Sequence, residues 1–271
     1  MKNVIAFIGF TIAILFCVVE SRVVLDVPYG EHKDQILDLH IPDDDSIRIN
    51  KIIIMLHGGA WWMGRKEDLN PHVAIIREKL PDYAIANMNY QLGSAESPGF
   101  PKQLDDIKAV IAFLKSSFTT NLSIAVFGNS AGALLALLYS YRWDQTSRDV
   151  KAVISHVGPV DLMVDFYCKN IVAYPFIVQL LGPDTCQENP HLWNETSPIT
   201  FVDERSPPTV GFYGSLDVLV PFGQMASLQE KLDSLQVPNA FARYPIGHTD
   251  WPDAHVQDMF TVMADFLTTH L

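Results

Sequence analysis

The chain has 271 residues, of which 48% are hydrophobic and 18% are charged. This length and apolar content predict one domain with one large core, and the isolated glycines and prolines, without heptad stretches, argue against disorder and against a coiled coil. The 19 lysines and arginines against 31 aspartates and glutamates give a net charge of −12. A nucleic acid or an anionic membrane surface would therefore be repelled, and no nucleic-acid partner is predicted.

The amino terminus, residues 1–21, is predicted to be a secretory signal peptide. A short start containing Lys2 precedes a run of 16 uncharged, mostly apolar residues, Val4–Val19, and a stretch compatible with cleavage ends at Ser21. Because a membrane-spanning helix needs about 20 apolar residues, a cleaved signal is favoured over an uncleaved anchor and over a buried core helix. The mature protein, residues 22–271, is then predicted to be secreted, with no stable membrane association.

Export changes what the cysteines indicate. Cys17 would leave with the signal, and the mature chain would keep Cys168 and Cys186. One disulfide can form and persist outside the cell, and two free, buried thiols are the alternative. Asn121 and Asn194 each begin an N-glycosylation sequon, which would be used only in a eukaryotic source.

After the signal, apolar strand-like runs alternate with helical patterns, as in a chain of βαβ units. The predicted strands are Ile36–Ile41, Lys51–Leu56, Tyr83–Asn87, Ser123–Phe127, Ala152–His156, Thr209–Tyr213 and Ala240–Tyr244. The predicted helices are Asn70–Leu80, Pro101–Ser116, Ala131–Tyr141, Pro221–Leu235 and Asp253–Thr269. Several strands are apolar without alternation, which is typical of strands covered on both faces. The fold class is therefore α/β, with a mostly parallel central sheet covered by helices on both faces and active-site groups expected at the carboxyl ends of the strands.

A glycine-rich segment, His57–Trp61, directly follows the predicted strand Lys51–Leu56. Glycines let backbone N–H groups approach a carbonyl oxygen that becomes an oxyanion during acyl transfer. We predict that the amides of Gly59 and Ala60 form an oxyanion hole, with a third amide from Ala131. The histidine of this segment is predicted to be structural and to order the loop.

The pentapeptide Gly128–Gly132 has the GxSxG pattern and lies where the predicted strand Ser123–Phe127 meets a predicted helix that begins at Ala131. This strand-turn-helix context is the one in which the pattern forms a sharp turn with an exposed nucleophile. Bulk two residues before or after the serine would obstruct the crossing of strand and helix. Ser130 is therefore the predicted nucleophile, and a turn serine that caps a helix is the alternative.

One segment, residues 161–206, does not follow the strand-helix alternation. It contains aromatic residues, prolines and both mature cysteines but shows no clear strand period. A loop of that length without regular structure is usually a functional insertion. We predict that it forms a cap over the site.

A serine hydroxyl needs a base to become a nucleophile at neutral pH. In folds with a nucleophile turn of this kind, the acid and then the histidine follow the serine in the chain, on turns after later strands. His248 lies just past the predicted strand Ala240–Tyr244 and is the predicted base. His156 also ends a predicted strand and is the main alternative, but it would leave no acid on a strand end between itself and Ser130.

The predicted acid is Asp217, which follows the predicted strand Thr209–Tyr213 and precedes a helix that begins at Pro221. Its task is to orient the imidazole and to stabilise its positive form. Asp161 also follows a strand, one unit earlier, and Asp250 is nearer to the histidine in sequence. Both remain alternatives on the sequence alone.

Neither a metal nor a cofactor is predicted. The nine histidines form no HExxH pattern, and Cys/His clusters at metal-ligand spacing are absent from the sequence. Trp61, Trp62 and Trp251 flank the glycine-rich segment and His248, and they either wall a pocket or pack in the core.

Four motifs carry a resemblance to a known family: His57–Trp61, Gly128–Gly132, Asp217–Pro221 and Gly247–His248. Together they resemble the α/β-hydrolase esterases of the HGG type, the group that is similar to hormone-sensitive lipase and to feruloyl esterases. Further similar stretches are Tyr29–Gly30, Leu37–Leu39, Asn89–Leu92 and Phe100–Pro101, so the resemblance covers nearly all of the mature chain. The sequence departs from the pattern at Ala60, where a third glycine is common, and at Asn129, but neither change removes a backbone N–H.

The resemblance implies a serine hydrolase that cleaves a small-molecule carboxylic ester through an acyl-enzyme, and the predicted signal peptide implies that this hydrolase is secreted. An amide or thioether-linked ester substrate is an alternative, because relatives similar to kynurenine formamidase and prenylcysteine methylesterase have similar motifs, although export argues against those cytosolic roles. A noncatalytic binding protein with this fold is a second alternative. Such proteins usually lack the serine, the acid or the histidine, and here all three are present.

Overall fold

The structure is a computed structural model that describes residues 23–44, 46–118, 121–170 and 173–271. The predicted signal peptide, residues 1–21, lies outside the described residues. In the described part of the chain, no helix is both long and apolar enough to cross a membrane.

The described residues form one eight-stranded sheet with strand order β1-β2-β4-β3-β5-β6-β7-β8. The strands are β1 Val23–Pro28, β2 Ile36–His40, β3 Lys51–Leu56, β4 Ala84–Met88, β5 Ser123–Asn129, β6 Val150–His156, β7 Thr209–Gly214 and β8 Asn239–Tyr244. β2 pairs antiparallel with both β1 and β4, and all other neighbours are parallel. The predicted mostly parallel sheet is therefore confirmed.

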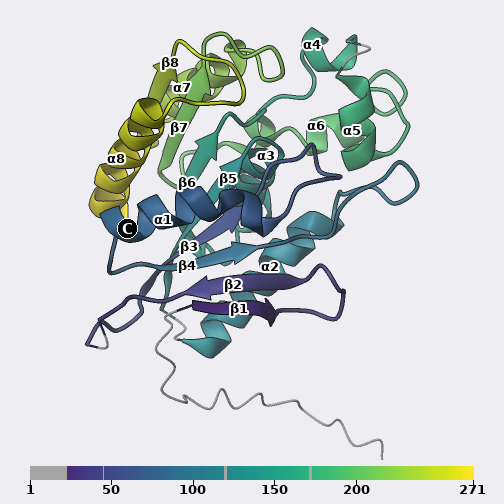
Figure 1. Cartoon of the computed structure of the whole chain (residues 1–271). Helices are drawn as coiled ribbons and strands as arrows, with labels where there is room; N and C mark the ends of the chain where they lie inside the picture. The colour runs from purple at the N-terminus through teal and green to yellow at the C-terminus, as the bar shows by residue number, and fades with distance from the viewer. Residues whose placement is uncertain (1–22, 45, 119–120, 171–172) are drawn as a thin grey trace, which may run out of the picture.

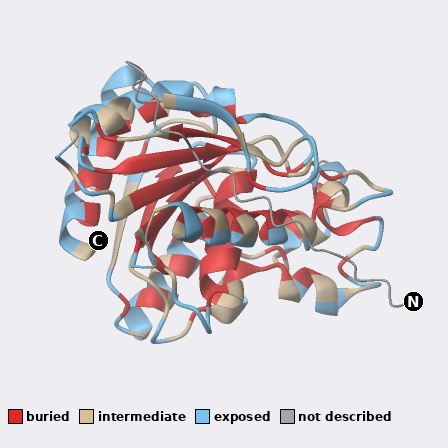
Figure 2. Ribbon diagram, turned by 90° about the horizontal axis from the view of Figure 1, so that it is seen from below, coloured by how far each residue is buried: buried red, intermediate tan, exposed pale blue. Residues whose placement is uncertain are grey.

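Helices cover both faces of this sheet (Figure 1). The longer ones are α1 Asn70–Lys79, α2 Lys102–Ser117, α3 Ala131–Leu138, α7 Gly223–Ser234 and α8 Asp253–His270, with short turns η1 Lys66–Leu69 and η2 Tyr139–Trp143. Alternate residues of β3 show why both layers are needed. Ile52 and Ile54 pack with the core under α2, α3 and α7, whereas Ile53 and Met55 pack with the core under α1 and α8. Figure 2 shows the buried sheet between helices whose outer faces are exposed.

Strand β1 was not predicted, and its burial pattern explains why. Most of its residues are exposed, including Val24 and Leu25, so the segment lacks the buried apolar run that marks the central strands. It is an edge strand that pairs with β2 alone. The predicted helix over residues 131–141 also differs, because the α-helix ends at Leu138 and continues as the π-helical turn η2.

The predicted cap, residues 161–206, is not a loop without regular structure. It contains α4 Asp165–Cys168, α5 Tyr174–Leu181, α6 Pro190–Glu195 and the 3₁₀ turn η3 Pro198–Phe201. Prolines occupy the first turns of α5, α6 and η3, where the missing N–H costs no helical hydrogen bond. These helices are too short to show a clear period in the sequence, and they group together on one side of the molecule (Figure 1).

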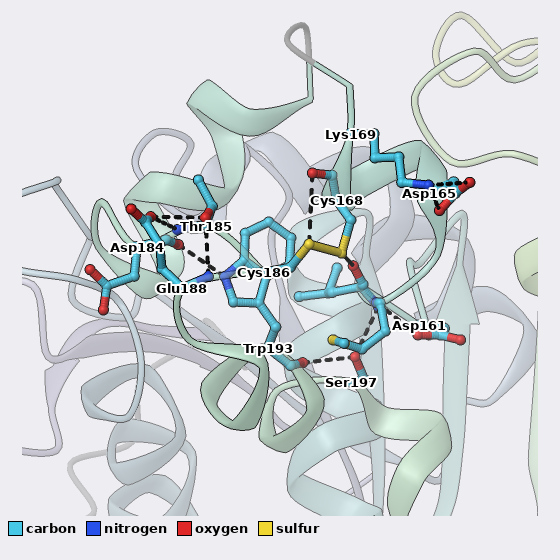
Figure 3. Close-up of a disulfide and its surroundings, with 12 residues drawn as sticks. Asp161, Asp165, Cys168, Lys169, Asp184, Thr185, Cys186, Glu188, Trp193 and Ser197 are labelled. Carbon is cyan, nitrogen blue, oxygen red and sulfur yellow. Dashed lines mark hydrogen bonds and ion pairs between the residues drawn. A yellow bond between two sulfur atoms is a disulfide. The ribbon is translucent and has the colours of Figure 1, made fainter.

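A disulfide and a buried tryptophan hold the cap together (Figure 3). The structure contains the predicted bridge between Cys168, at the end of α4, and Cys186, with 5.5 Å between the Cα atoms. Trp193 of α6 is fully buried and donates its indole N–H to the carbonyl of Asp184 at 3.0 Å. Ser197 donates to the carbonyl of Trp193 at 2.9 Å and accepts the N–H of Leu162, also at 2.9 Å. The cap is therefore a packed unit fastened to the chain that leaves β6.

Removing the bridge is expected to loosen the cap before it unfolds the sheet. The bridge closes a loop of 18 residues, and closure of that size contributes on the order of 3 kcal/mol in the chain-entropy model. Because the sheet has its own packing, Cys168→Ser/Cys186→Ser should raise the rate of proteolysis between residues 161 and 206 and leave the far-ultraviolet circular dichroism unchanged. Two reactive thiols in the unfolded, unreduced mature protein would contradict the presence of this disulfide.

Candidate active site

Ser130 lies at the tip of the turn between β5 and α3. Its φ is 50° and its ψ is −114°, an uncommon conformation for a residue with a side chain. A Cβ added to Gly128 would overlap the carbonyl oxygen of Gly132, and one added to Gly132 would overlap the carbonyl oxygen of His57. Both glycines are therefore needed where strand and helix cross. The amide of Ser130 donates to the carbonyl of His156 at 2.8 Å, which fixes the turn to β6.

His248 and Asp217 reach Ser130 from the loops after β8 and β7. The Oγ of Ser130 lies 2.8 Å from Nε2 of His248, and Nδ1 of His248 lies 2.7 Å from Oδ2 of Asp217. A carboxylate at Nδ1 favours the tautomer that carries its proton there. That tautomer leaves Nε2 free to accept the hydroxyl proton of Ser130. The structure thus brings the three predicted residues together in one chain of hydrogen bonds.

Two backbone hydrogen bonds join the acid turn, residues 214–220, to the loop that carries His248. The amide of Leu216 donates to the carbonyl of Ile246 at 3.0 Å, and the amide of Ser215 donates to Tyr244 at 2.8 Å. Oδ1 of Asp217 accepts the N–H groups of Leu219 at 2.8 Å and of Val220 at 2.9 Å. The Asp217 side chain is fully buried, so its charge is held by three partners in a fixed orientation.

His156 and Asp161, the alternative base and one alternative acid, have other partners. Burial lowers the pKa of His156 well below its usual value. Its Nδ1 lies 2.8 Å from the side-chain nitrogen of Asn129, and its ring packs edge-on against Trp251. Asp161 accepts the N–H of Met163 within its own turn at 2.8 Å. Neither side chain is hydrogen-bonded to the Ser130 hydroxyl.

Asp250, the other alternative, is exposed and accepts the hydroxyl of its neighbour Thr249 at 3.0 Å. No hydrogen bond or ion pair between Asp250 and His248 occurs among the described residues. Of the three carboxylates considered, Asp217 is the one that contacts the imidazole.

The predicted oxyanion amides lie in a strained loop and at the start of α3. Gly59, Ala60 and Trp61 all have positive φ, 114°, 49° and 67°, and the carbonyl of Gly59 accepts the N–H of Met63 at 3.0 Å. Ala60 and Ala131 line the same cavity as Ser130. Within the described residues, the amides of Gly59, Ala60 and Ala131 donate no loop or turn hydrogen bond to the protein. Amides without a partner in the protein are what the predicted oxyanion hole requires.

His57 orders this loop from inside, in agreement with its predicted structural role. It is fully buried, and its ring stacks on Tyr90 with 4.2 Å between ring centroids. Tyr90 donates its hydroxyl to the carbonyl of His57 at 2.8 Å, and Nδ1 of His57 lies 2.6 Å from the carbonyl of Gly58. Burial lowers the pKa of His57, so it stays neutral as a packing and hydrogen-bonding group.

Ser130 and His248 open into a cavity of about 110 Å³. The cap supplies one wall from α4 and α5, and the acid turn supplies Val218–Val220. The sequence predicted that the cap would cover the site but not which of its residues line the cavity, because short helices give no readable period. The three tryptophans that flank the motifs have different environments. Trp61 lines the cavity, Trp62 is exposed, and Trp251 packs against His156.

No group of three or more histidine, cysteine, aspartate or glutamate side chains in the described parts of the chain is placed to hold a metal ion. The arrangement at Ser130 can remove a proton from a hydroxyl, hold the resulting imidazolium and receive a carbonyl oxygen between backbone amides. Acyl transfer is the chemistry that uses these three capacities together.

Comparison with known proteins places these features among related sequences and structures. The protein-family model BD-FAE matches residues 37–232. Esterase LipC of Mycobacterium tuberculosis is 23% identical over 242 residues, which are 84% of this chain and 58% of that protein. Kynurenine formamidase of Salmo salar is 25% identical over 146 residues, which are 53% of this chain and 48% of that protein. The chain thus spans about half the length of these curated relatives.

Among solved structures, a truncated form of a carbohydrate esterase from gut microbiota has a TM-score of 0.76 and 23% sequence identity. The match covers 92% of this chain and 96% of that one. At this level of identity the likeness concerns the fold, which includes the mostly parallel sheet and the helices on both its faces.

Proposed function

Because this chain belongs to the BD-FAE family and has the α/β-hydrolase fold, we propose that it is a serine hydrolase that cleaves carboxylic esters of small molecules through an acyl-enzyme. The observation that carries the proposal is the continuous hydrogen-bonded chain from Ser130 through His248 to Asp217, which faces a cavity. The esterase name of the relative LipC supports it.

The reaction runs in two halves. The Oγ of Ser130 attacks the ester carbonyl while Nε2 of His248 takes its proton, and the amides of Gly59, Ala60 and Ala131 hold the oxyanion. His248 then returns the proton to the departing alcohol, and an acyl group remains on Ser130. Water, deprotonated by His248, then attacks the acyl carbonyl. The bond to the Oγ of Ser130 breaks, His248 returns the proton to that oxygen, and the carboxylic acid is released. Asp217 stabilises the imidazolium in both halves and remains ionised. The scheme requires no metal and no cofactor.

The experiment that tests this function compares an ester with an amide. With p-nitrophenyl butyrate, formation of an acyl-enzyme predicts a burst of about one p-nitrophenol per chain when deacylation limits turnover. The amide substrates are N-formylkynurenine and a matched p-nitroanilide. Amide hydrolysis is the second candidate function because one relative is a kynurenine formamidase. Faster turnover of an amide than of the ester would favour that candidate, and no reaction with either would favour a noncatalytic binding protein.

Secretion is part of the same proposal. The apolar run of residues 4–19 and the disulfide of the cap support export of the chain as a mature domain of residues 22–271. Mass analysis of the protein from the culture medium is expected to give an amino terminus near Arg22. A membrane-bound product that retains Met1 would instead indicate an uncleaved anchor.

A further inference from the structure

The cavity beside Ser130 is walled on the cap side by one face of α5. Phe176 and Ile177 of α5 line it together with Ala173, the N-cap residue of that helix, and their spacing of three and four residues places the three on the same side. Ala173 and Ile177 are buried, whereas Phe176 is 37% exposed. This face therefore runs from the interior of the cavity to its mouth.

The lining is almost entirely hydrocarbon. Among its described residues there is no lysine, arginine, aspartate or glutamate. Apart from Ser130 and His248, the lining residues with a polar side-chain group are Asn170, Tyr167 and Trp61. Tyr167 donates its hydroxyl to the carbonyl of Leu219 at 3.2 Å, and Trp61 donates its indole N–H to the carbonyl of Ala131 at 3.1 Å. A charged or hydroxyl-rich group would lose water here without gaining matching partners. An apolar group would bind by burial alone.

Exposed apolar side chains continue this surface outward. Val218 and Leu219 line the cavity next to Asp217 and are 78% and 43% exposed. Of the eight large apolar residues that are exposed in the described chain, six belong to the acid turn, to α5 or to the loop that follows Trp61. Three of these six, Phe176, Val218 and Leu219, line the cavity itself. Exposed apolar side chains at a pocket are typical of a binding surface.

We infer that the cavity and its rim form a binding site for an uncharged aliphatic chain of the ester. Ala173 and Ile177 contact the part of the chain nearest to the reacting carbonyl, and Phe176, Val218 and Leu219 contact the part that reaches the surface. This inference rests on the proposed function and adds the substrate class: neutral lipophilic esters, in preference to esters in which a sugar or a charged group must fill the cavity.

The test is a chain-length series on the mature protein, kept below the solubility limit of each ester. Acyl chains are varied from p-nitrophenyl acetate to octanoate, and alcohol chains from ethyl to octyl acetate. The series that lengthens the chain bound in the cavity, acyl or alcohol, should show kcat/KM rising about fourfold per methylene until the cavity is filled. Acetylated xylose, with its short acyl group and polar alcohol, is expected to be a poorer substrate than octanoate or octyl acetate.

Two variants probe the inner and outer parts of the site. Ala173→Leu fills the cavity and should lower the ratio of kcat/KM for long over short chains by on the order of tenfold. Val218→Ser changes an exposed side chain, so folding is not at risk, and it should lower the same ratio by about threefold. Val24→Ser is the matched control, since Val24 is 49% exposed but lies on the edge strand β1. It should leave the ratio unchanged.

Active enzyme is counted in each preparation by labelling with a fluorophosphonate probe. A labelled wild-type protein with flat profiles in both series, or with a preference for acetylated xylose, would overturn the aliphatic site and leave the serine mechanism standing. If the ratio of kcat/KM for long over short chains is the same in Val218→Ser and Val24→Ser, the exposed residues at the cavity mouth do not contact the aliphatic chain. Failure of the wild-type protein to label would instead contradict the proposed function itself.

Discussion

Ser130→Ala is expected to lower kcat/KM for p-nitrophenyl butyrate by at least about a thousandfold while the protein stays folded. Alanine keeps the Cβ of Ser130 and with it the turn at a φ of 50°. It removes the Oγ that lies 2.8 Å from His248. What remains is binding and oxyanion stabilisation, which cannot replace a nucleophile.

Ser116→Ala is the matched control for this change. Ser116 is exposed on α2, where its hydroxyl donates to the carbonyl of Phe113 at 2.8 Å. The control should keep wild-type turnover, and both variants should show wild-type circular dichroism. A folded Ser130→Ala protein with near-normal turnover would exclude the serine mechanism.

Asp217→Asn is expected to reduce turnover on the order of a thousandfold or more. The amide can still accept the N–H groups of Leu219 and Val220, so the turn is kept. An amide NH₂ facing Nδ1 of His248 favours the wrong tautomer and does not stabilise the imidazolium. The loss should therefore appear mainly in kcat, measured with p-nitrophenyl butyrate at saturation.

Asp161→Asn applies the same chemical change to the carboxylate that follows the neighbouring strand β6. Asp161 accepts a backbone N–H from Met163 and makes no contact with His248, so this variant should keep most of its activity. The reverse ranking of the two variants would assign the role of the acid to Asp161.

Sequence reasoning predicted the sheet best where strands are buried on both faces. The run Ile52–Leu56 is apolar without interruption, and β3 has the predicted bounds, Lys51–Leu56. The edge strand β1 has no such run, because Val24 and Leu25 face solvent. Its pairing with β2 depends on tertiary contacts, which the local sequence pattern does not predict.

The candidate site could be predicted because parallel strands end at one edge of the sheet. Ser130, Asp217 and His248 follow β5, β7 and β8, so their order in the chain predicts that they meet. The cavity could not be predicted in the same way. Ala173 and Ile177 line it because a disulfide and the buried Trp193 shape the cap, and such contacts have no period in the sequence.

The glycine-rich loop shows a second limit of the sequence pattern. Its glycines indicated close approach of backbone amides, but Ala60 and Trp61 also adopt positive φ, which neither residue type favours. The indole of Trp61 donates to the carbonyl of Ala131 at 3.1 Å, and Gly93 donates to the carbonyl of Trp61 at 2.8 Å. These long-range contacts hold the loop in a conformation that its local sequence does not specify.

The most direct test of the central claim is to locate the residue that a fluorophosphonate probe modifies. The mature protein is treated with the probe, digested and analysed by tandem mass spectrometry, with Ser130→Ala treated in parallel. We predict one adduct per chain, on Ser130, with loss of esterase activity in proportion to labelling and no adduct in the variant. An active enzyme that is not labelled, or one labelled and inactivated at another residue, would contradict the assignment of Ser130 as the nucleophile.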